Sequence, residues 1–129
     1  MILLSSVVRI FLCTRPTDMR KGFDGLTGLV QECFDQDPLT GHLFLFVNRR
    51  RDRIKILYFD RDGLAIWYKR LEAGSFEIPH ASERNGIELQ GTQLALILSG
   101  IDLTTARQRK RFPQAGGMPK LRENPSRST

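Results

Sequence analysis

Apolar residues recur along the chain with two different spacings. In residues 18–34 they follow one another at steps of four and three, which places them on one face of a helix. These residues are Met19, Phe23, Leu26, Val30 and Cys33. After Pro38 the pattern changes to short apolar runs separated by turn residues, which is typical of strands. The pattern therefore predicts a helix followed by a sheet.

Strand-like runs cover residues 7–12, 43–47, 53–59 and 64–70, with shorter candidates at residues 75–78 and 87–90. The pair Asp62-Gly63 favours a two-residue hairpin turn, because both residues tolerate positive φ. Residues 92–98 predict a short second helix. We expect an α+β fold in which an antiparallel sheet of about four or five strands packs on one main helix.

The helix predicted at residues 18–34 has two unusual features. Thr17 stands at the position of an N-cap, but the basic residues Arg20 and Lys21 then occupy the first turn, against the helix dipole. Glycines also interrupt the helix, and each costs up to about 1 kcal/mol relative to alanine. We expect another backbone or a ligand to approach them closely; they are Gly22, Gly25 and Gly28.

The positive charge of the chain is concentrated at its C-terminal end. Residues 1–106 carry 13 basic and 13 acidic side chains, whereas residues 107–129 carry 7 basic side chains and one acidic. We expect a single domain over residues 1–104, which is an ordinary domain size. Residues 105–129 are rich in proline, glycine and basic residues and predict a disordered tail.

A second basic cluster lies inside the neutral part of the chain, between the strands predicted at residues 43–47 and 53–59. Guanidinium groups bind phosphate bidentately, and an exposed hairpin tip can contact a nucleic-acid backbone. The alternative is a solvated loop without a partner. The candidate phosphate ligands are Arg49, Arg50, Arg51, Arg53 and Lys55.

Two further basic groups are candidates for nucleic-acid contact. Arg20 and Lys21 stand where free N–H groups at a helix start favour an anion, although Arg20 could instead pair with Asp24. The tail could add nonspecific phosphate contacts, or could simply be a soluble terminus. Its candidate residues are Arg107, Arg109, Lys110 and Arg111.

The sequence contains no recognisable catalytic set. Three aspartates are possible metal ligands, but two of them belong to the predicted turn; the three are Asp52, Asp60 and Asp62. His42 and His80 have no partner at ligand spacing. Cys13 and Cys33 lie in apolar segments and suit inert core positions in a reducing compartment. We expect a cytoplasmic protein with no membrane span, no metal, no cofactor and no enzymatic activity.

Several long strings resemble one family. Residues 17–26, Thr-Asp-Met-Arg-Lys-Gly-Phe-Asp-Gly-Leu, are similar to the opening signature of the TnpB accessory proteins of insertion sequence family sixty-six, the Orf-two-like proteins. Residues 41–46, 50–58 and 67–72, with Asp60 and Gly63, resemble its central block, and residues 93–94 and 100–102 resemble its closing motif. Phe59 stands where many relatives have tryptophan, and the tail after Asp102 matches no pattern of the family.

This resemblance implies a gene within a transposon operon, where a separate and larger transposase supplies the catalytic residues. The expected function is therefore an accessory role in transposition, with contact to DNA at the transposon ends. The alternative is an adaptor that binds the transposase or another operon product without touching DNA.

Overall fold

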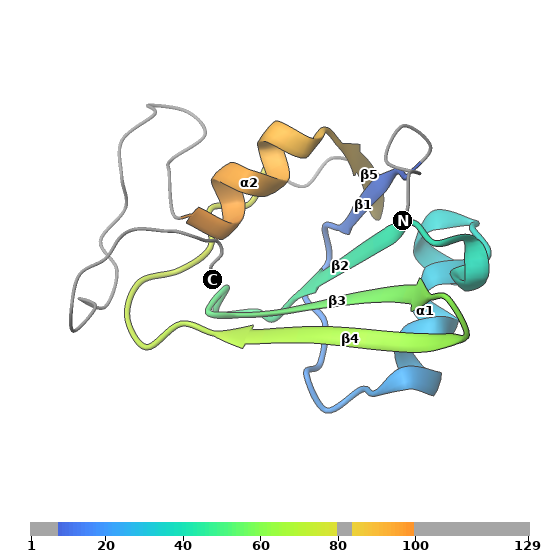
Figure 1. Ribbon diagram of the computed structural model, residues 1–129. Helices are drawn as coiled ribbons and strands as arrows, with labels where there is room; N and C mark the ends of the chain where they lie inside the picture. The colour runs from blue at the N-terminus through green and yellow to red at the C-terminus, as the bar shows by residue number, and fades with distance from the viewer. Residues whose placement is uncertain (1–7, 80–83, 100–129) are drawn as a thin grey trace.

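The computed structural model of the chain describes residues 8–79 and 84–99, which form one five-stranded sheet between two helices (Figure 1). The predicted α+β class is confirmed. The elements in chain order are β1 (Ile10–Cys13), α1 (Phe23–Phe34), the 3₁₀ turn η2 (Pro38–Thr40), β2 (Leu43–Val47), β3 (Arg53–Asp60), β4 (Gly63–Arg70), β5 (Gly86–Leu89) and α2 (Gly91–Ser99). The tail predicted at residues 105–129 lies outside the described residues.

The sheet has the strand order β4-β3-β2-β1-β5. The meander predicted for β2, β3 and β4 is confirmed, and β5 also pairs antiparallel with β1. In contrast, β1 and β2 run parallel, with Ile10 opposite Leu43, because α1 and η2 carry the chain back across the sheet between them. The sheet is therefore mixed, and β1 and β2 end at the same edge.

The turn between β3 and β4 differs by one residue from the prediction. Asp60 pairs with Gly63, so the two-residue turn consists of Arg61 and Asp62 rather than of Asp62 and Gly63. Within this turn, the backbone φ angle of Arg61 is positive, at 61°. Glycine was expected at the turn because of its conformational freedom, but Gly63 is instead the first residue of β4.

The strand predicted at residues 75–78 is not present. Phe76 and Ile78 are nevertheless buried, because this segment packs across the face of the sheet that α2 covers. The N–H of Phe76 donates to the carbonyl oxygen of Arg51 at 2.6 Å. The apolar side chains of this segment therefore reflect burial, not membership of the sheet.

The main helix begins at Phe23, not near residue 18 as predicted. The predicted cap, Thr17, is buried beside the sheet, and Gly22 takes the N-cap position without a side-chain hydrogen bond. In a helix, the carbonyl oxygens of Met19 and Lys21 would accept N–H groups four residues further on. Here both accept hydrogen bonds of 2.8 Å from the ammonium group of Lys55, and the segment before Phe23 forms a turn, in which the N–H of Lys21 donates to the carbonyl oxygen of Asp18, instead of a helix.

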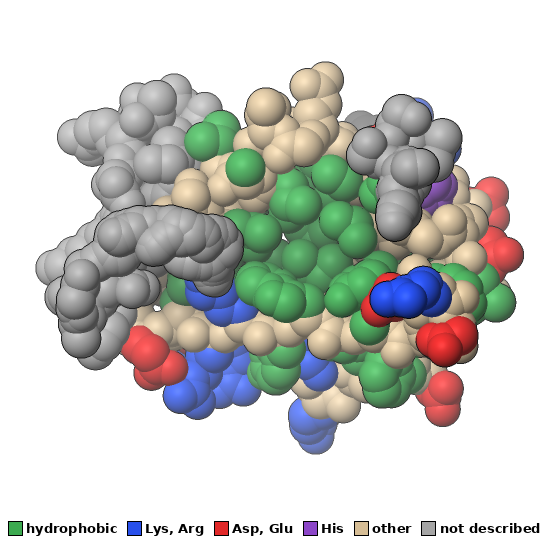
Figure 2. Space-filling model, in the orientation of Figure 1, with side chains coloured by type: hydrophobic (Ala, Val, Ile, Leu, Met, Phe, Trp, Pro, Cys, Tyr) green, Lys and Arg blue, Asp and Glu red, His purple; other side chains and the backbone are tan. Residues whose placement is uncertain are grey.

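Each face of the sheet has its own apolar layer. On the α1 side, the rings of four phenylalanines pack with centroids 5.5–6.0 Å apart; they are Phe11, Phe34, Phe44 and Phe46. On the α2 side, Ile97 is fully buried together with Leu45 and Ile54. Figure 2 shows the apolar side chains that gather on this second face, beneath α2 and over the middle of the sheet.

The close approach expected at the helix glycines occurs at a different glycine. A Cβ atom added to Gly22 or Gly28 would meet nothing within 4 Å, and at Gly25 it would meet only the side chain of Lys21. In β5, by contrast, a Cβ atom on Gly86 would lie 2.7 Å from the carbonyl oxygen of Cys33. The end of α1 therefore packs directly against the backbone of β5.

Candidate nucleic-acid interface

The arginine loop, residues 48–53, leaves the sheet at the edge where β1 and β2 both end. The parallel pairing of these strands also brings the segment after β1, residues 14–22, to this edge. The N–H of Thr17 donates to the carbonyl oxygen of Val47 at 2.8 Å. Two of the strings that resemble the family signature thus lie side by side in the fold.

The side chain of Asn48 organises the arginine loop. Its amide oxygen accepts hydrogen bonds from the backbone N–H groups of Asp52 and Arg53, both at 3.0 Å. Its amide nitrogen donates to the Asp52 carboxylate at 2.7 Å. The carbonyl oxygen of Asn48 accepts from the N–H of Arg51, whose φ of 61° turns the chain. One residue therefore fixes both ends of the loop.

A second set of hydrogen bonds ties the loop to residues 71–76. The N–H of Leu71 donates to the carbonyl oxygen of Asp52 at 2.7 Å, and the N–H of Phe76 donates to that of Arg51. The loop backbone is therefore held by the Asn48 side chain on one side and by this segment on the other. Such a loop can present its side chains without a large loss of conformational entropy on binding.

Three guanidinium groups project from this held backbone. Arg49, Arg50 and Arg51 are exposed, and within residues 8–79 and 84–99 none of them forms an ion pair. The two nearby carboxylates have other partners: Asp52 binds Asn48, and Asp18 binds Arg20. The positive charge of the loop is therefore available to an external anion.

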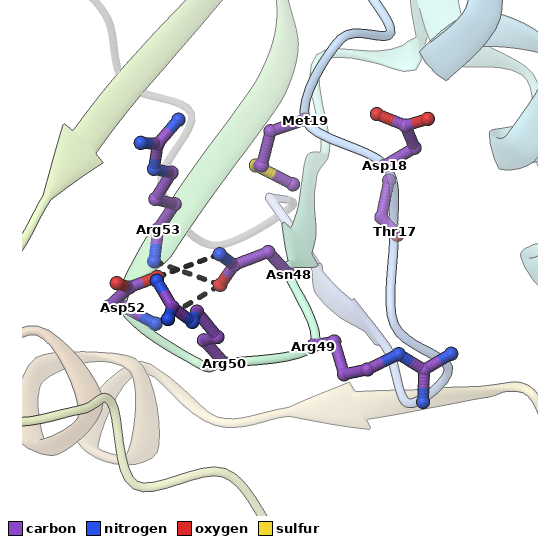
Figure 3. A pocket seen from close by; sticks show the side chains of 8 residues that line it. All are labelled: Thr17, Asp18, Met19, Asn48, Arg49, Arg50, Asp52 and Arg53. Atoms are coloured by element: carbon purple, nitrogen blue, oxygen red, sulfur yellow. Dashed lines mark hydrogen bonds between the residues drawn. The ribbon is translucent and has the colours of Figure 1, made fainter.

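A solvent-open hollow of about 340 Å³ lies between the arginine loop and residues 17–19 (Figure 3). Arg49 and Arg53 point in different directions from the loop, and Met19 lies across from them, on the segment that carries Thr17 and Asp18. Nη1 of Arg53 is 3.3 Å from the hydroxyl oxygen of Tyr68, which is itself exposed. Three of the predicted phosphate ligands thus line this hollow, namely Arg49, Arg50 and Arg53.

Lys55 does not belong to this exposed set, although it was predicted as a phosphate ligand. Its side chain is only 8% exposed, and its ammonium group donates to the carbonyl oxygens of Met19 and Lys21. The alternation of strand β3 turns Lys55 toward the α1 side of the sheet, next to the segment that follows β1. Lys55 therefore positions this segment and is not available to phosphate.

Arg20 and Lys21 precede the helix instead of forming its first turn. The guanidinium group of Arg20 forms a bidentate pair with Asp18, not with Asp24, and the shortest N–O distance is 2.7 Å. These hydrogen bonds lower the pKa of Asp18 to about 2. Arg20 and Lys21 therefore do not stand at the helix start, where the anion site was predicted. The tail candidates Arg107, Arg109, Lys110 and Arg111 lie outside the described residues.

The aspartates considered as metal ligands do not converge. Asp52 directly precedes β3, whereas Asp60 and Asp62 lie at the other end of this strand. A strand of eight residues separates the two ends by about 25 Å. Within the described part of the chain, no three His, Cys, Asp or Glu side chains are grouped to hold a metal ion. Neither described helix has the length and apolar character needed to cross a membrane.

Sequence reasoning missed two residues of this surface, Asn48 and Thr17. Asn48 directly precedes the arginine run, and asparagine commonly binds backbone groups in turns, so its position was an available signal. Thr17 was assigned to a helix cap because nothing local distinguishes that role from its contact with β2.

Comparison with known proteins agrees with the resemblance. Residues 8–108 match the model of the family described as IS66 Orf2 like protein. Two Sinorhizobium fredii proteins are similar over most of their length: uncharacterized protein y4hO is 41% identical over 74% of this chain and 82% of its own, and uncharacterized protein y4jC is 32% identical over 79% of this chain and 86% of its own. No solved structure matches the chain. The chain belongs to the IS66 Orf2-like family, which ties it to an accessory role in transposition.

Proposed function

We propose that this protein assists a separate transposase by contacting the DNA backbone through its arginine loop. The observation that carries the proposal is the set of three exposed guanidinium groups on a backbone that is already held in place. Arg49, Arg50 and Arg51 have no acidic partner among the described residues. A phosphate would supply one, and guanidinium binds it with two parallel hydrogen bonds.

The other basic residues contribute unequally. Arg53 lies at the rim of the hollow and can reach a phosphate while it contacts Tyr68. Arg20 is neutralised by Asp18, so it adds little net charge. Lys21 is exposed and adds one charge at the same edge. In the tail, Arg107, Arg109, Lys110 and Arg111 add affinity through nonspecific phosphate contacts.

The protein has no catalytic activity of its own in this proposal. It acts in the cytoplasm at the transposon ends, and the larger transposase supplies the chemistry. Its partners are DNA, the transposase and other products of the same operon.

A second candidate function is an adaptor that binds the transposase without touching DNA. The observation that favours it is a pair of exposed aromatic side chains on the edge strand β4, one on each face of the sheet. Trp67 is 39% exposed and Tyr68 is 47% exposed, and these residue types are enriched at protein interfaces. The basic loop would then face acidic protein surface.

Salt dependence of DNA binding tests the first proposal. If the loop and tail neutralise about six phosphates, the logarithm of affinity falls with the logarithm of salt concentration at a slope of roughly −5. Changing Arg49, Arg50 and Arg51 together to alanine should flatten this slope by about two to three units. Fluorescence anisotropy measures the slope for the wild type and for the variant. The DNA duplexes carry either the transposon-end sequence or an unrelated sequence.

The control removes basic side chains from the opposite end of the sheet. Arg9 directly precedes β1, and Arg61 lies in the turn between β3 and β4. Changing both to alanine should leave the slope near its original value, because neither residue lies near the arginine loop. An unchanged slope in the loop variant, with an intact circular dichroism spectrum, contradicts DNA contact by the loop. If that variant also loses the transposase in a pull-down without DNA, the adaptor function replaces the proposal.

A further inference from the structure

Two free cysteines meet where the end of β1 faces the last turn of α1. Sγ of Cys13 lies 3.5 Å from Sγ of Cys33. Cys13 is buried, whereas Cys33 is half-buried. The two cysteines are 20 residues apart in the chain, and no local pattern links them, so each was predicted as an inert core residue.

The fold brings this pair together through a glycine. Cys13 pairs with Gly86 across the β1–β5 ladder. A Cβ atom at Gly86 would lie 2.7 Å from the carbonyl oxygen of Cys33 and 2.4 Å from the ring of Phe34. Because this position lacks a side chain, the last turn of α1 lies close enough to β1 for the sulfur atoms to approach each other.

The surroundings of the two sulfur atoms differ. Nη2 of Arg15 lies 3.2 Å from Sγ of Cys33, and the Glu32 carboxylate lies 3.8 Å from the same guanidinium nitrogen. The thiol of Cys13 donates to the carbonyl oxygen of Arg15. Burial raises the pKa of Cys13 to about 11, so this thiol keeps its proton. Cys33 is the sulfur that solvent and a guanidinium group both reach.

We propose that Cys13 and Cys33 form a dithiol modification site that hydroperoxides convert to an intramolecular disulfide. The sulfur of Cys33 attacks one peroxide oxygen, the O–O bond breaks, and the second oxygen leaves as water or alcohol. The resulting sulfenic acid on Cys33 is then attacked by the sulfur of Cys13. The S–O bond breaks and its oxygen leaves as water with the proton of Cys13. The two thiols lose two electrons in total, and the peroxide gains them.

Arg15 assists the first step. Its guanidinium group stabilises negative charge on the sulfur of Cys33 during the attack. Disulfide formation needs the sulfur atoms to move from 3.5 Å to bonding distance, about 2 Å, which a small side-chain rotation provides. The new bond would join β1 to the end of α1, across the segment that carries Thr17 and Met19. This inference does not depend on DNA binding.

The test uses the reduced full-length protein, treated with hydrogen peroxide and then denatured in iodoacetamide. We expect both thiols to escape alkylation together, and peptide mass mapping to join the peptides of Cys13 and Cys33 within one chain. Reduction should restore both thiols. In the Cys13→Ser variant, Cys33 should stop at sulfenic acid, which dimedone captures; in Cys33→Ser, Cys13 should stay reduced.

The rate of oxidation tests the role of Arg15. The Arg15→Leu variant should oxidise about tenfold more slowly, because one charge-assisted hydrogen bond to sulfur is lost. The matched Arg9→Leu variant should oxidise at the original rate. The inference is overturned if both wild-type thiols remain alkylatable after a treatment that oxidises dithiothreitol, or if disulfides form only between molecules. Equal rates in wild type and Arg15→Leu would remove Arg15 from the site.

Discussion

The ammonium group of Lys55 lies 4.7 Å from the centre of the Tyr68 ring, directly across the β3–β4 ladder. Together with its two carbonyl partners, this ring surrounds a charge that is almost fully removed from water. Lys55 therefore acts as an internal link between the sheet and the segment before α1.

Changing Lys55 to methionine should lower the free energy of unfolding by about 3 kcal/mol, because two carbonyl oxygens lose a charged donor. Urea unfolding measures this loss. The control is Lys21→Met, whose side chain is exposed and whose effect should stay within about 0.5 kcal/mol. Equal effects of the two substitutions would contradict the role of Lys55 as an internal link.

Asn48 offers a way to disturb the arginine loop without changing its charge. Asn48→Ala removes three hydrogen bonds within the loop and should cost about 1–3 kcal/mol of stability. If the loop binds DNA, affinity should fall about threefold to tenfold while the salt slope stays constant, because the number of charges is unchanged. Asn85→Ala is the control, because this exposed residue directly precedes β5, which is separated from β3 by β1 and β2 in the sheet. A changed slope in Asn48→Ala would show that the variant alters more than loop geometry.

Two glycine substitutions should change stability in opposite directions. Gly28→Ala places a methyl group in open space on α1 and should stabilise the protein by about 0.5–1 kcal/mol. Gly86→Ala forces a methyl group against the Cys33 carbonyl oxygen and should destabilise it by about 1–3 kcal/mol. Thermal unfolding of the two variants measures whether each substitution raises or lowers stability. A stabilising Gly86→Ala would mean that α1 and β5 are less closely packed than described.

His42 should make stability depend on pH. Its Nδ1 accepts a hydrogen bond from the N–H of Arg9, and burial, with the nearby Arg9 charge, lowers the pKa of His42 below its ordinary 6.5. The unfolded chain therefore binds this proton first, so stability is complete above pH 6.5 and declines as the pH falls below it. The effect is small because the ring is partly exposed. The urea concentration at the midpoint of unfolding should differ between about pH 7.5 and about pH 5.5, and this difference should be smaller in His42→Gln than in the wild type.

The isolated protein should neither cut nor join DNA. The aspartates at the two ends of β3 are too far apart to share a metal ion, and two-metal sites need ions about 4 Å apart. Incubation of terminal DNA with magnesium should leave it intact, with a metal-dependent nuclease as the positive control. Strand cleavage that disappears in Asp60→Ala or Asp62→Ala would contradict this prediction.

The strands of the meander could be predicted from the sequence because each is a short apolar run bounded by its own turn residues. The start of α1 could not be predicted, because Lys55 supplies the competing hydrogen bonds from 34 residues further along the chain. The parallel pairing of β1 and β2 was missed for the same reason: strand direction depends on the connection between strands. Local pattern therefore identified the elements, whereas contacts between distant segments determined where they end.

The candidate site was predictable only in part. The arginine run is visible in the sequence, and its exposure at a hairpin tip follows from the strands on either side. The different position of Lys55 follows from alternation along β3, which places it on the opposite face from Ile54 and next to α1. The proximity of Thr17 and Met19 to the arginine loop requires the mixed sheet, which no local spacing encodes.

The pairing of β1 with β5 joins the two ends of the described chain, and this has a consequence for folding. Contacts between distant segments form late, because the loop between them must close first. We expect the local hairpins of β2, β3 and β4 to form early, with the arginine loop already at their tip. The segment with Thr17 and Met19 joins them only when β1 enters the sheet. The hollow beside the arginine loop is therefore completed by the last step of folding, and it is also the first feature lost when β1 detaches.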